Sequence, residues 1–287
     1  MTKSAPLVSV CIPVHNCAAY IDQAIESVLA QTMSDWELVI LDNASSDGTA
    51  AIARSYIDHR IRIVEHPQNL GLEANWNKAL EESRGQYIKL LPADDYLLPR
   101  CLETQVAALA LEVSRKAVLT CCGRRIISPA GDTLLTRRFS RRDGYFPGSA
   151  AIRKIVRSGT NLLGEPGAIL FRRDVLQRTG SFSASLLYVI DVDLWMRILL
   201  CGDLFTLAEP LCAFRLSAGS NSVELAALHS HHFSSFIWRL YADPRYSVHR
   251  LDAYQGILMS QLLSWARRLV YLFTLRSAPV VEDGRAR

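Results

Sequence analysis

The sequence predicts an α/β fold in which a mostly parallel sheet is flanked by helices, followed by a mixed region and a C-terminal helical region. Short apolar strand candidates alternate with helix candidates over the first hundred residues or so, and the connections between them are short. The chain has 287 residues, 49% of them hydrophobic, which is enough to fill a sizeable core. The alternation stops after Arg115, so the second half must be built differently.

The first half, residues 1–115, has the pattern of a Rossmann-like unit. Apolar runs predict strands at 7–13, 36–41, 61–65 and 87–91. Helical spacing of apolar residues, capping residues and Pro99 predict helices at 18–31, 49–56, 72–83 and 99–112. Parallel strands need such helical crossovers, so these elements form one sheet covered on both faces.

The second half divides into two parts. Short strands are predicted at 117–120 and 125–128 around Gly123, then at 167–171, 205–207 and 211–216, with helices at 152–157 and 190–200. We interpret residues 116–222 as a mixed extension that completes one side of a cleft in the same domain. Residues 223–287 form a C-terminal helical extension, with a frayed tail from Ser277.

Composition narrows the class of protein. The net charge of +4 does not imply nucleic-acid binding, and paired arginines in the middle of the chain, such as Arg124 and Arg125, indicate a solvated face or a contact with phosphate or an anionic membrane. Seven cysteines without a CxxC pair indicate a reducing compartment. No signal peptide or membrane-spanning run is evident, so a cytoplasmic protein is expected. Residues 265–273 are expected to pack on the catalytic domain or a partner, or alternatively to lie peripherally on a membrane.

Carboxylates follow two of the predicted strands. Asp94 and Asp95 come after the strand 87–91, where they form either an acidic turn or a site for Mg²⁺ or Mn²⁺ holding a phosphate-bearing substrate. Asp42 ends the strand 36–41, so its carboxylate should face the ligand crevice, where it can accept hydrogen bonds from a base or ribose. There is no GxGxxG motif, so a dinucleotide fold is not supported.

Two further sites have open alternatives. Arg215 precedes the loop 217–222 and binds a pyrophosphate or is an ordinary surface arginine. Asp191 and Asp193 lie two apart near a helix start, so they point in different directions, and one of them serves only to stabilise the helix N-terminus.

Six segments in order resemble glycosyltransferase family 2 over roughly residues 6–220. They are residues 8–16, 38–49, 69–71, 75–77, 91–95 and 191–197, which read VSVCIPVHN, LVILDNASSDGT, NLG, NWN, LPADD and DVDLWMR. The resemblance implies a GT-A fold, a nucleotide-sugar donor, a divalent metal (Mn or Mg) and inversion at the anomeric carbon. Residues 1–115 would then be the nucleotide-sugar-binding half, and residues 116–222 the acceptor-side half, of one catalytic domain.

The resemblance also implies roles for individual residues. Pro13, His15 and Asp42 should line the nucleotide site, and Asn75 belongs to a matching motif beside it. Asp94 matches the last acid of the metal motif, and Asp95 matches the acid that often follows it. Asp191 matches the general base, which must take a proton because a sugar hydroxyl is otherwise a poor nucleophile.

Two positions depart from the family pattern. Pro92 stands where the first acid of the metal motif would be, which leaves Asp94 to hold the metal with phosphate oxygens and water. Asn43 replaces a second acid after the strand 36–41, and its amide still offers a donor and an acceptor to a base edge.

The sequence therefore predicts an inverting glycosyltransferase acting on a hydroxyl of a glycan or lipid-linked acceptor, in bacterial-type surface polysaccharide synthesis. The alternatives are a sugar-nucleotide nucleotidyltransferase, which would want a Gly-rich basic loop where His15 stands, or a non-catalytic nucleotide-sugar-binding module, suggested by Pro92 and Asn43.

Overall fold

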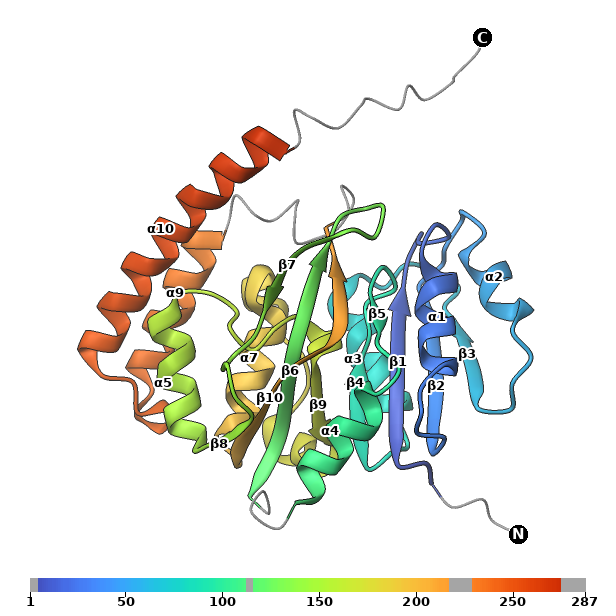
Figure 1. The fold of residues 1–287 in the computed structure, drawn as a ribbon, viewed down its shortest axis with the longest axis horizontal. Helices are drawn as coiled ribbons and strands as arrows, with labels where there is room; N and C mark the ends of the chain where they lie inside the picture. Colours follow the sequence, from blue (N-terminus) through green and yellow to red (C-terminus); the bar gives the residue numbers. More distant parts are fainter. Residues whose placement is uncertain (1–4, 112–115, 217–228, 275–287) are drawn as a thin grey trace.

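A single mixed sheet forms the centre of the molecule, with helices on both of its faces (Figure 1). The computed structural model describes residues 5–111, 116–216 and 229–274, and the predicted loop 217–222 lies outside them. The sheet has ten strands, eight of which follow the order β3-β2-β1-β4-β9-β6-β10-β5, while β7 pairs with β6 and β8 with β10. This mixed α/β architecture confirms the predicted fold class.

The first half follows the predicted alternation closely. Strands β1 to β4 are parallel, with β1 between β2 and β4, and β3 outside β2. The amphipathic pattern of each helix turns its apolar face to this sheet. The elements are β1 (Val8–Val14), α1 (Ile21–Leu29), β2 (Trp36–Asp42), α2 (Thr49–Ser55), β3 (Ile61–Glu65), α3 (Leu72–Glu82) and β4 (Tyr87–Leu90).

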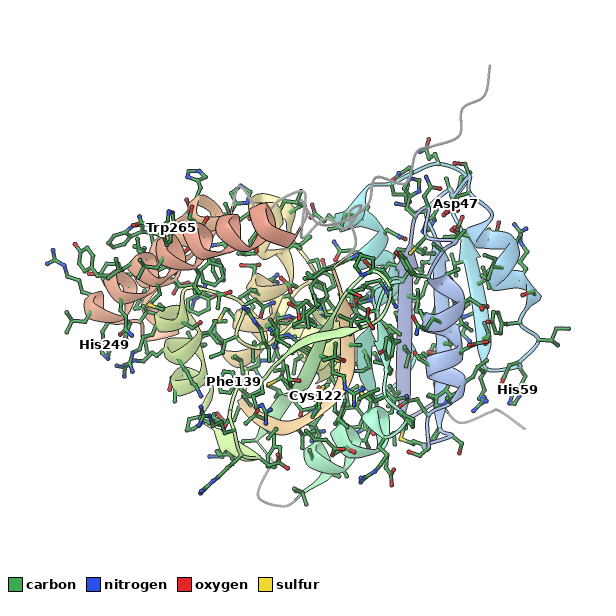
Figure 2. All side chains as sticks on the ribbon, turned by 45° about the horizontal axis from the view of Figure 1, so that its top comes forward. Asp47, His59, Cys122, Phe139, His249 and Trp265 are labelled. Atoms are coloured by element: carbon green, nitrogen blue, oxygen red, sulfur yellow. The ribbon has the colours of Figure 1, made fainter. Side chains whose placement is uncertain are left out.

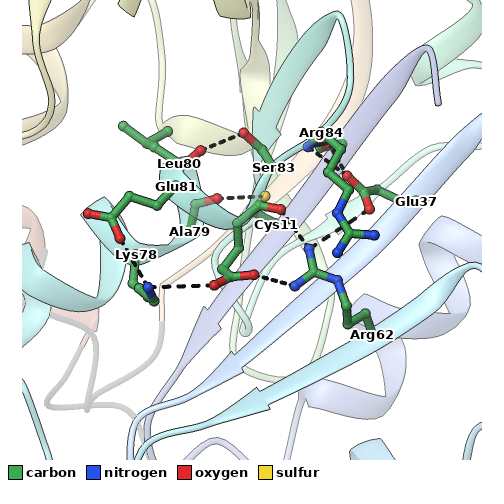
Figure 3. A network of polar contacts seen from close by, with 11 residues as sticks. Cys11, Glu37, Arg62, Lys78, Ala79, Leu80, Glu81, Ser83 and Arg84 are labelled. Atoms are coloured by element: carbon green, nitrogen blue, oxygen red, sulfur yellow. Dashed lines mark hydrogen bonds and ion pairs between the residues drawn. The ribbon is translucent and has the colours of Figure 1, made fainter. Parts of the chain in front are cut away.

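Charged side chains tie α3 to the strands beneath it. Figure 3 shows the guanidinium of Arg62, on β3, between Glu37 of β2 and the end of α3. Its Nη2 donates to the carbonyl oxygen of Glu82 at 2.6 Å and its Nη1 pairs with the Glu82 carboxylate. The third helix therefore stays fixed against the second and third strands.

The second half joins the same sheet by antiparallel pairing. Strand β9 runs antiparallel to both β4 and β6, and β10 runs parallel to β6. The first half ends with β5 (Tyr96–Leu97) and α4 (Cys101–Ala110). The elements of the second half are β6 (Ala117–Ile127), β7 (Thr133–Arg137), β8 (Gly144–Phe146), α5 (Gly148–Ser158), η2 (Pro166–Ala168), β9 (Ile169–Arg172), η3 (Arg173–Val175), α6 (Leu176–Thr179), η4 (Ala184–Val189), α7 (Ile190–Leu199) and β10 (Asp203–Arg215).

Two predicted strand breaks are wrong. The strands expected on either side of Gly123 are one strand, β6, and those expected at 205–207 and 211–216 are one strand, β10. The register between β6 and β10 shifts on both sides of Pro210, so the β10 backbone bulges toward β6. A Cβ atom on Gly123 would lie 2.7 Å from the carbonyl oxygen of Ala208. The glycine therefore accommodates a close neighbour and does not end the strand.

The C-terminal helices α9 (His229–Ala242) and α10 (Arg250–Thr274), joined through η6 (Pro244–Tyr246), pack beside α5 (Figure 1). Buried Asp252 of α10 accepts from Nε of Arg153 at 2.8 Å and pairs with Arg157, both on α5. Gly256 touches the backbone of α5, where a Cβ would overlap the Val156 carbonyl. No helix in the described ranges combines the length and the apolarity that crossing a bilayer requires.

The predicted division at residues 115 and 222 stays a prediction. Strands from both sides of residue 115 share the one sheet.

Candidate active site

The carboxyl ends of the parallel strands β1 and β2 meet at one edge of the sheet. Val14 pairs with Asp42 at that edge, and Pro13 lies buried beside Leu41. Asp42 is buried and its Oδ2 accepts from the backbone N–H of Ser45 at 3.0 Å. The residues predicted to line the nucleotide site therefore lie at the ends of buried, rigid strands.

Two buried oxygen atoms near this edge have no hydrogen-bond donor among the described residues: Oδ1 of Asp42 and Oδ1 of Asn75. Asn75, on α3, donates through Nδ2 to the carbonyl oxygen of Leu41 at 3.3 Å, which places it against the end of β2. Unpaired buried acceptors are costly in a folded protein. A ligand with N–H or O–H donors, such as a nucleoside, would satisfy them.

Asn43 holds the surrounding loops through its side chain. Its Oδ1 accepts from the Leu70 N–H at 2.8 Å and its Nδ2 donates to Oδ1 of Asn69 at 2.9 Å. The Asn43 amide, which was predicted to meet a base edge, is thus hydrogen-bonded within the protein and connects β2 to the segment before α3.

His15 is exposed on the loop after β1, and its ring is oriented by two neighbours. Nδ1 lies 2.9 Å from the Asn43 carbonyl oxygen, which can only accept, so Nδ1 carries the proton. Nε2 then accepts from Nδ2 of Asn69 at 3.1 Å. An oriented, exposed ring at this edge suits contact with a flat ligand group.

Asp94 and Asp95 follow β4 at the same edge of the sheet. Asp95 is buried, and its Oδ1 accepts from the backbone N–H of Arg215 at 2.9 Å, while Asp94 is partly buried. Burial, with the adjacent charge of Asp94, raises the pKa of Asp95 well above its ordinary value. A divalent cation would relieve this repulsion, so the two carboxylates fit the predicted metal.

The metal would need ligands from outside this pair. Within residues 5–111, 116–216 and 229–274, no group of three or more His, Cys, Asp or Glu side chains could hold an ion. Mg²⁺ is commonly held by one or two carboxylates with phosphate oxygens and water, and Asp94 with Asp95 offers that set.

Arg215, predicted to bind a pyrophosphate or to be a surface arginine, lies buried against the loop of Asp94. Its side chain is buried over the ring of Tyr20, with the guanidinium carbon 4.6 Å from the ring centre. Nε donates to the Asp94 carbonyl oxygen at 3.0 Å, Nη1 donates to the Pro129 carbonyl oxygen at 2.8 Å and Nη2 donates to the Gln23 side chain. The guanidinium is therefore engaged by the protein, and Arg215 fixes the loop that carries Asp94.

Asp191 and Asp193, both in the first turn of α7, have different surroundings. Asp193 pairs with Arg197 at 2.8 Å and with Arg239 of α9, so it joins two helices. Asp191 has no ion pair among the described residues; its Oδ2 accepts from Nδ2 of Asn161 at 2.9 Å. Burial of its carboxyl, with the charge of Glu165, raises the pKa of Asp191 to about 7. These surroundings favour Asp191 over Asp193 as a proton acceptor.

Three residues beside Asp191 were not identified from the sequence: Asn161, Glu165 and Arg124. Arg124 was expected on a solvated face, but it is buried in β6 and pairs with Glu165. The local sequence carries no signal for Asn161. The only hint was the turn-forming series Gly164, Glu165 and Pro166, which marks a tight loop.

A cavity of about 690 Å³ lies elsewhere, near the amino end of β1, lined by residues such as Leu7, Arg84 and Arg172. Charges of both signs line it, including Arg84 and Glu81, and none of the predicted site residues does. None of its lining residues belongs to the sheet edge where Asp42 and Asp94 lie.

Comparison with known proteins decides the family. The family model described as "Glycosyl transferase family 2" matches residues 9–180. The chain belongs to glycosyl transferase family 2. This glycosyltransferase is 32% identical over 237 residues to an uncharacterized protein of Mycobacterium tuberculosis (strain CDC 1551 / Oshkosh), covering 79% of this chain and 72% of that one.

Relatives with more informative names match shorter stretches. The chain is 37% identical over 136 residues to a putative teichuronic acid biosynthesis glycosyltransferase of Bacillus subtilis (strain 168), covering 47% of this chain and 53% of that protein. It is 38% identical over 122 residues to chondroitin synthase of Escherichia coli, covering 42% of this chain and 17% of the synthase. These relatives are named for polysaccharide synthesis.

Solved structures share the GT-A fold. S. aureus TarS in complex with UDP-GlcNAc superposes with a TM-score of 0.67 at 15% identity, covering 95% of this chain and 76% of that one. The mannosyltransferase PcManGT from Pyrobaculum calidifontis, in complex with GDP-Man and Mn²⁺, gives 0.64 at 17%, again over 95% and 76%. At such identities the likeness concerns the fold alone.

Proposed function

We propose that this glycosyltransferase moves a sugar from a nucleotide-sugar donor to a hydroxyl of a glycan or lipid-linked acceptor, with inversion at the anomeric carbon. The observation that carries the proposal is Asp191, a carboxylate held by an amide without a cation partner among the described residues. TarS and PcManGT, which share the fold, are described with UDP-GlcNAc and GDP-Man. Relatives named for teichuronic acid and chondroitin support surface polysaccharide as the product class.

In the proposed reaction Asp191 accepts the proton of the acceptor hydroxyl. The hydroxyl oxygen bonds to the anomeric carbon while the bond to the donor phosphate oxygen breaks, and the nucleoside diphosphate leaves with the electron pair. Attack opposite the leaving group inverts the anomeric centre. With the pKa of Asp191 at about 7, the carboxylate form is present near neutral pH yet basic enough to accept a proton.

The donor side would be held by the edge that ends β1, β2 and β4. Asp42 and Asn75 offer acceptors to the nucleoside, and His15 offers its ring. Asp94 and Asp95 would hold Mg²⁺ or Mn²⁺, which neutralises charge on the departing diphosphate when bound.

A donor screen tests this assignment. Melting temperature is measured with UDP-, GDP- and dTDP-sugars, with and without Mn²⁺, and each stabilising donor is then assayed for release of nucleoside diphosphate with glycan and lipid-linked acceptors. We expect metal-dependent stabilisation by one nucleotide class and turnover that Asp191→Asn abolishes. Binding without turnover across acceptors would favour a non-catalytic module, and sugar-1-phosphate with a nucleoside triphosphate as the productive substrates would favour a nucleotidyltransferase.

The C-terminal helices carry an exposed apolar face. On α10 the face follows helical spacing, with Leu251 82% exposed and Trp265 65% exposed at its two ends. Figure 2 shows Trp265 on this outer helix, on the opposite side of the molecule from His59. Large apolar side chains of the face are Leu251, Tyr254, Leu258, Leu262 and Trp265, with Trp238 and Tyr241 of α9.

We propose that this face rests on the cytoplasmic surface of a membrane. Tryptophan and tyrosine, which favour the bilayer interface, make up four of the seven side chains, and Arg250 lies at the start of the same helix. A membrane contact would present a lipid-linked acceptor to the enzyme. Packing of a second chain on the same face is the alternative outcome.

Vesicle binding separates the two. Wild type and the double variant Leu258→Glu/Leu262→Glu are sedimented with vesicles of phosphatidylglycerol and phosphatidylethanolamine, and their mass is measured without lipid. We expect the double variant to lose vesicle binding, while Ile57→Glu, at a fully exposed apolar residue distant from α10, keeps it. The membrane contact would be contradicted if the wild type did not bind vesicles and formed a dimer, while the double variant were a monomer.

A further inference from the structure

The loop between α5 and η2 is folded around one amide side chain. Oδ1 of Asn161 accepts from the Gly164 N–H at 2.9 Å, and Nδ2 donates to the Gly164 carbonyl oxygen at 2.9 Å. The same Nδ2 donates to Oδ2 of Asp191 at 2.9 Å. Asn161 thus connects a closed loop to the carboxylate proposed as the base.

We propose that Asn161 is the positioning residue of Asp191, and that the ion pair between buried Arg124 and Glu165, the last residue of the same loop, sets the charge that this carboxylate meets. The inference deepens the proposed function and rests on it for the role of Asp191. None of these three residues is required to touch the substrates.

The hydrogen bonds of Asp191 leave it oriented but still able to accept. Its Oδ1 accepts from the N–H of Val192 at 2.8 Å, and its Oδ2 accepts from Asn161. A carboxylate oxygen has two lone pairs, so Oδ2 keeps one for an acceptor hydroxyl. Holding the carboxylate in one rotamer reduces the entropy lost on reaching the reactive geometry.

The ion pair joins this loop to β6. Nε of Arg124 pairs with Glu165, and Nη2 donates to the Asn161 carbonyl oxygen at 3.3 Å. Gly164 passes so close that a Cβ there would lie 3.1 Å from Nη1 of Arg124, at a φ of +116° that favours glycine. Arg124 therefore supports the backbone that carries Asn161.

The charges near Asp191 come from three elements. Glu165, before η2, raises the pKa of Asp191, and Arg124, on β6, lowers it. On α7 itself, Asp193 is paired with Arg197 and Arg239. Loss of the Glu165 charge leaves Arg124 unopposed, so both effects move the pKa of Asp191 downward.

Direct titration of Asp191 tests the inference without relying on turnover. The protein is labelled with carbon-13 at the aspartate carboxyl carbons, the Asp191 signal is assigned with Asp191→Asn, and its pKa is measured by NMR in wild type, Asn161→Ala and Glu165→Gln. We expect Asn161→Ala to raise the pKa of Asp191 by about 1, because a hydrogen bond to the charged form is lost, and Glu165→Gln to lower it.

Asn77→Ala is the matched control. Its Nδ2 donates to the Phe182 carbonyl oxygen at 3.0 Å and its Oδ1 accepts from the Phe182 N–H at 2.8 Å, so its amide binds both backbone groups of one residue, as that of Asn161 does, without touching Asp191. It should reduce the melting temperature similarly and leave the Asp191 titration unchanged.

Unchanged titration in both Asn161→Ala and Glu165→Gln would overturn the inference, as would an equal shift in Asn77→Ala. If no donor is turned over, the proposed function fails while this titration still decides the positioning. Where turnover is found, Asn161→Ala should lower kcat about tenfold with little change in the donor KM.

Discussion

The two halves of the sheet hold their polar site residues in different ways. On the donor side, Asp42 is bound by the backbone of Ser45, three residues away, and Asp94 and Asp95 stand at the end of a strand. On the proposed acceptor side, Asp191 is bound by Asn161, thirty residues away in the chain, whose carbonyl oxygen accepts from the buried Arg124 of the Arg124–Glu165 ion pair. A local turn positions Asp42, whereas the carboxyl groups of Asp95 and Asp191 also depend on long-range contacts, from Arg215 and Asn161 respectively.

This difference separates binding from catalysis. Acids on the donor side are expected to matter through a cation and a nucleotide, which stabilise the protein when they bind. Acids on the acceptor side divide into one that is held ready to accept a proton, Asp191, and one that joins helices, Asp193. Removing each in turn should therefore change different measurements.

Among the donor-side changes, the largest effect is expected from Asp94→Ala. Loss of the predicted metal ligand removes several kcal/mol of transition-state stabilisation, which corresponds to a decrease in kcat/KM of about 10²–10³. The Mn²⁺-dependent rise in melting temperature with donor should disappear in the same variant. Asp58→Asn, with the same charge change beside Arg60 before β3, serves as the control and should retain both. Full activity of Asp94→Ala in the absence of a divalent metal would contradict the proposed metal site.

On the acceptor side, Asp193→Asn should affect stability before it affects turnover. The change leaves Arg197 and Arg239 without their shared carboxylate, and we expect the free energy of unfolding to fall by about 1–3 kcal/mol. Denaturant unfolding measures this, with Asp243→Asn, in a local pair with exposed Arg245, as a control that should show a smaller change. If Asp193→Asn kept its stability but lost turnover, Asp193 and not Asp191 would be the better candidate for the base.

A smaller effect is expected at the contact between β6 and β10. Gly123→Ala would bring a Cβ to 2.7 Å from the Ala208 carbonyl oxygen, and overpacking of this kind costs about 1–3 kcal/mol. Gly144→Ala, whose Cβ would meet only the Phe146 ring at 3.9 Å, is the matched control in thermal unfolding. Equal stability of the two variants would contradict this expectation and would mean that the β10 backbone can move away at its bulge.

The sequence predicted the donor side well because its signals are local. Apolar runs and helical spacing gave β1 to β4 and α1 to α3 nearly to their ends, and Asp42 stands at the end of β2 where it was expected. The site roles of these residues stay predictions, since no observation tests them.

The sequence predicted the acceptor side less well because its contacts join distant segments. Gly123 signalled a break by composition, but its reason is the bulge of β10 some eighty residues later. The ion pair of Arg124 with Glu165 was not predicted, because the two residues are distant in the chain. The same holds for Arg215, whose guanidinium donates to the carbonyl oxygens of Asp94 and Pro129. Pairing of this kind has no period or motif in a single sequence.

The pH dependence of kcat/KM in wild type and Asp191→Asn, with one donor and one acceptor, tests the central claim most directly. The wild-type rate should rise with pH through about 7, because Asp191 must lose its proton before it can accept one. Asp191→Asn should lose this limb and 10²–10⁴ of the rate, as general bases typically contribute, while the donor still raises the melting temperature. A variant that kept the wild-type rate and the same rise with pH would show that another group takes the proton.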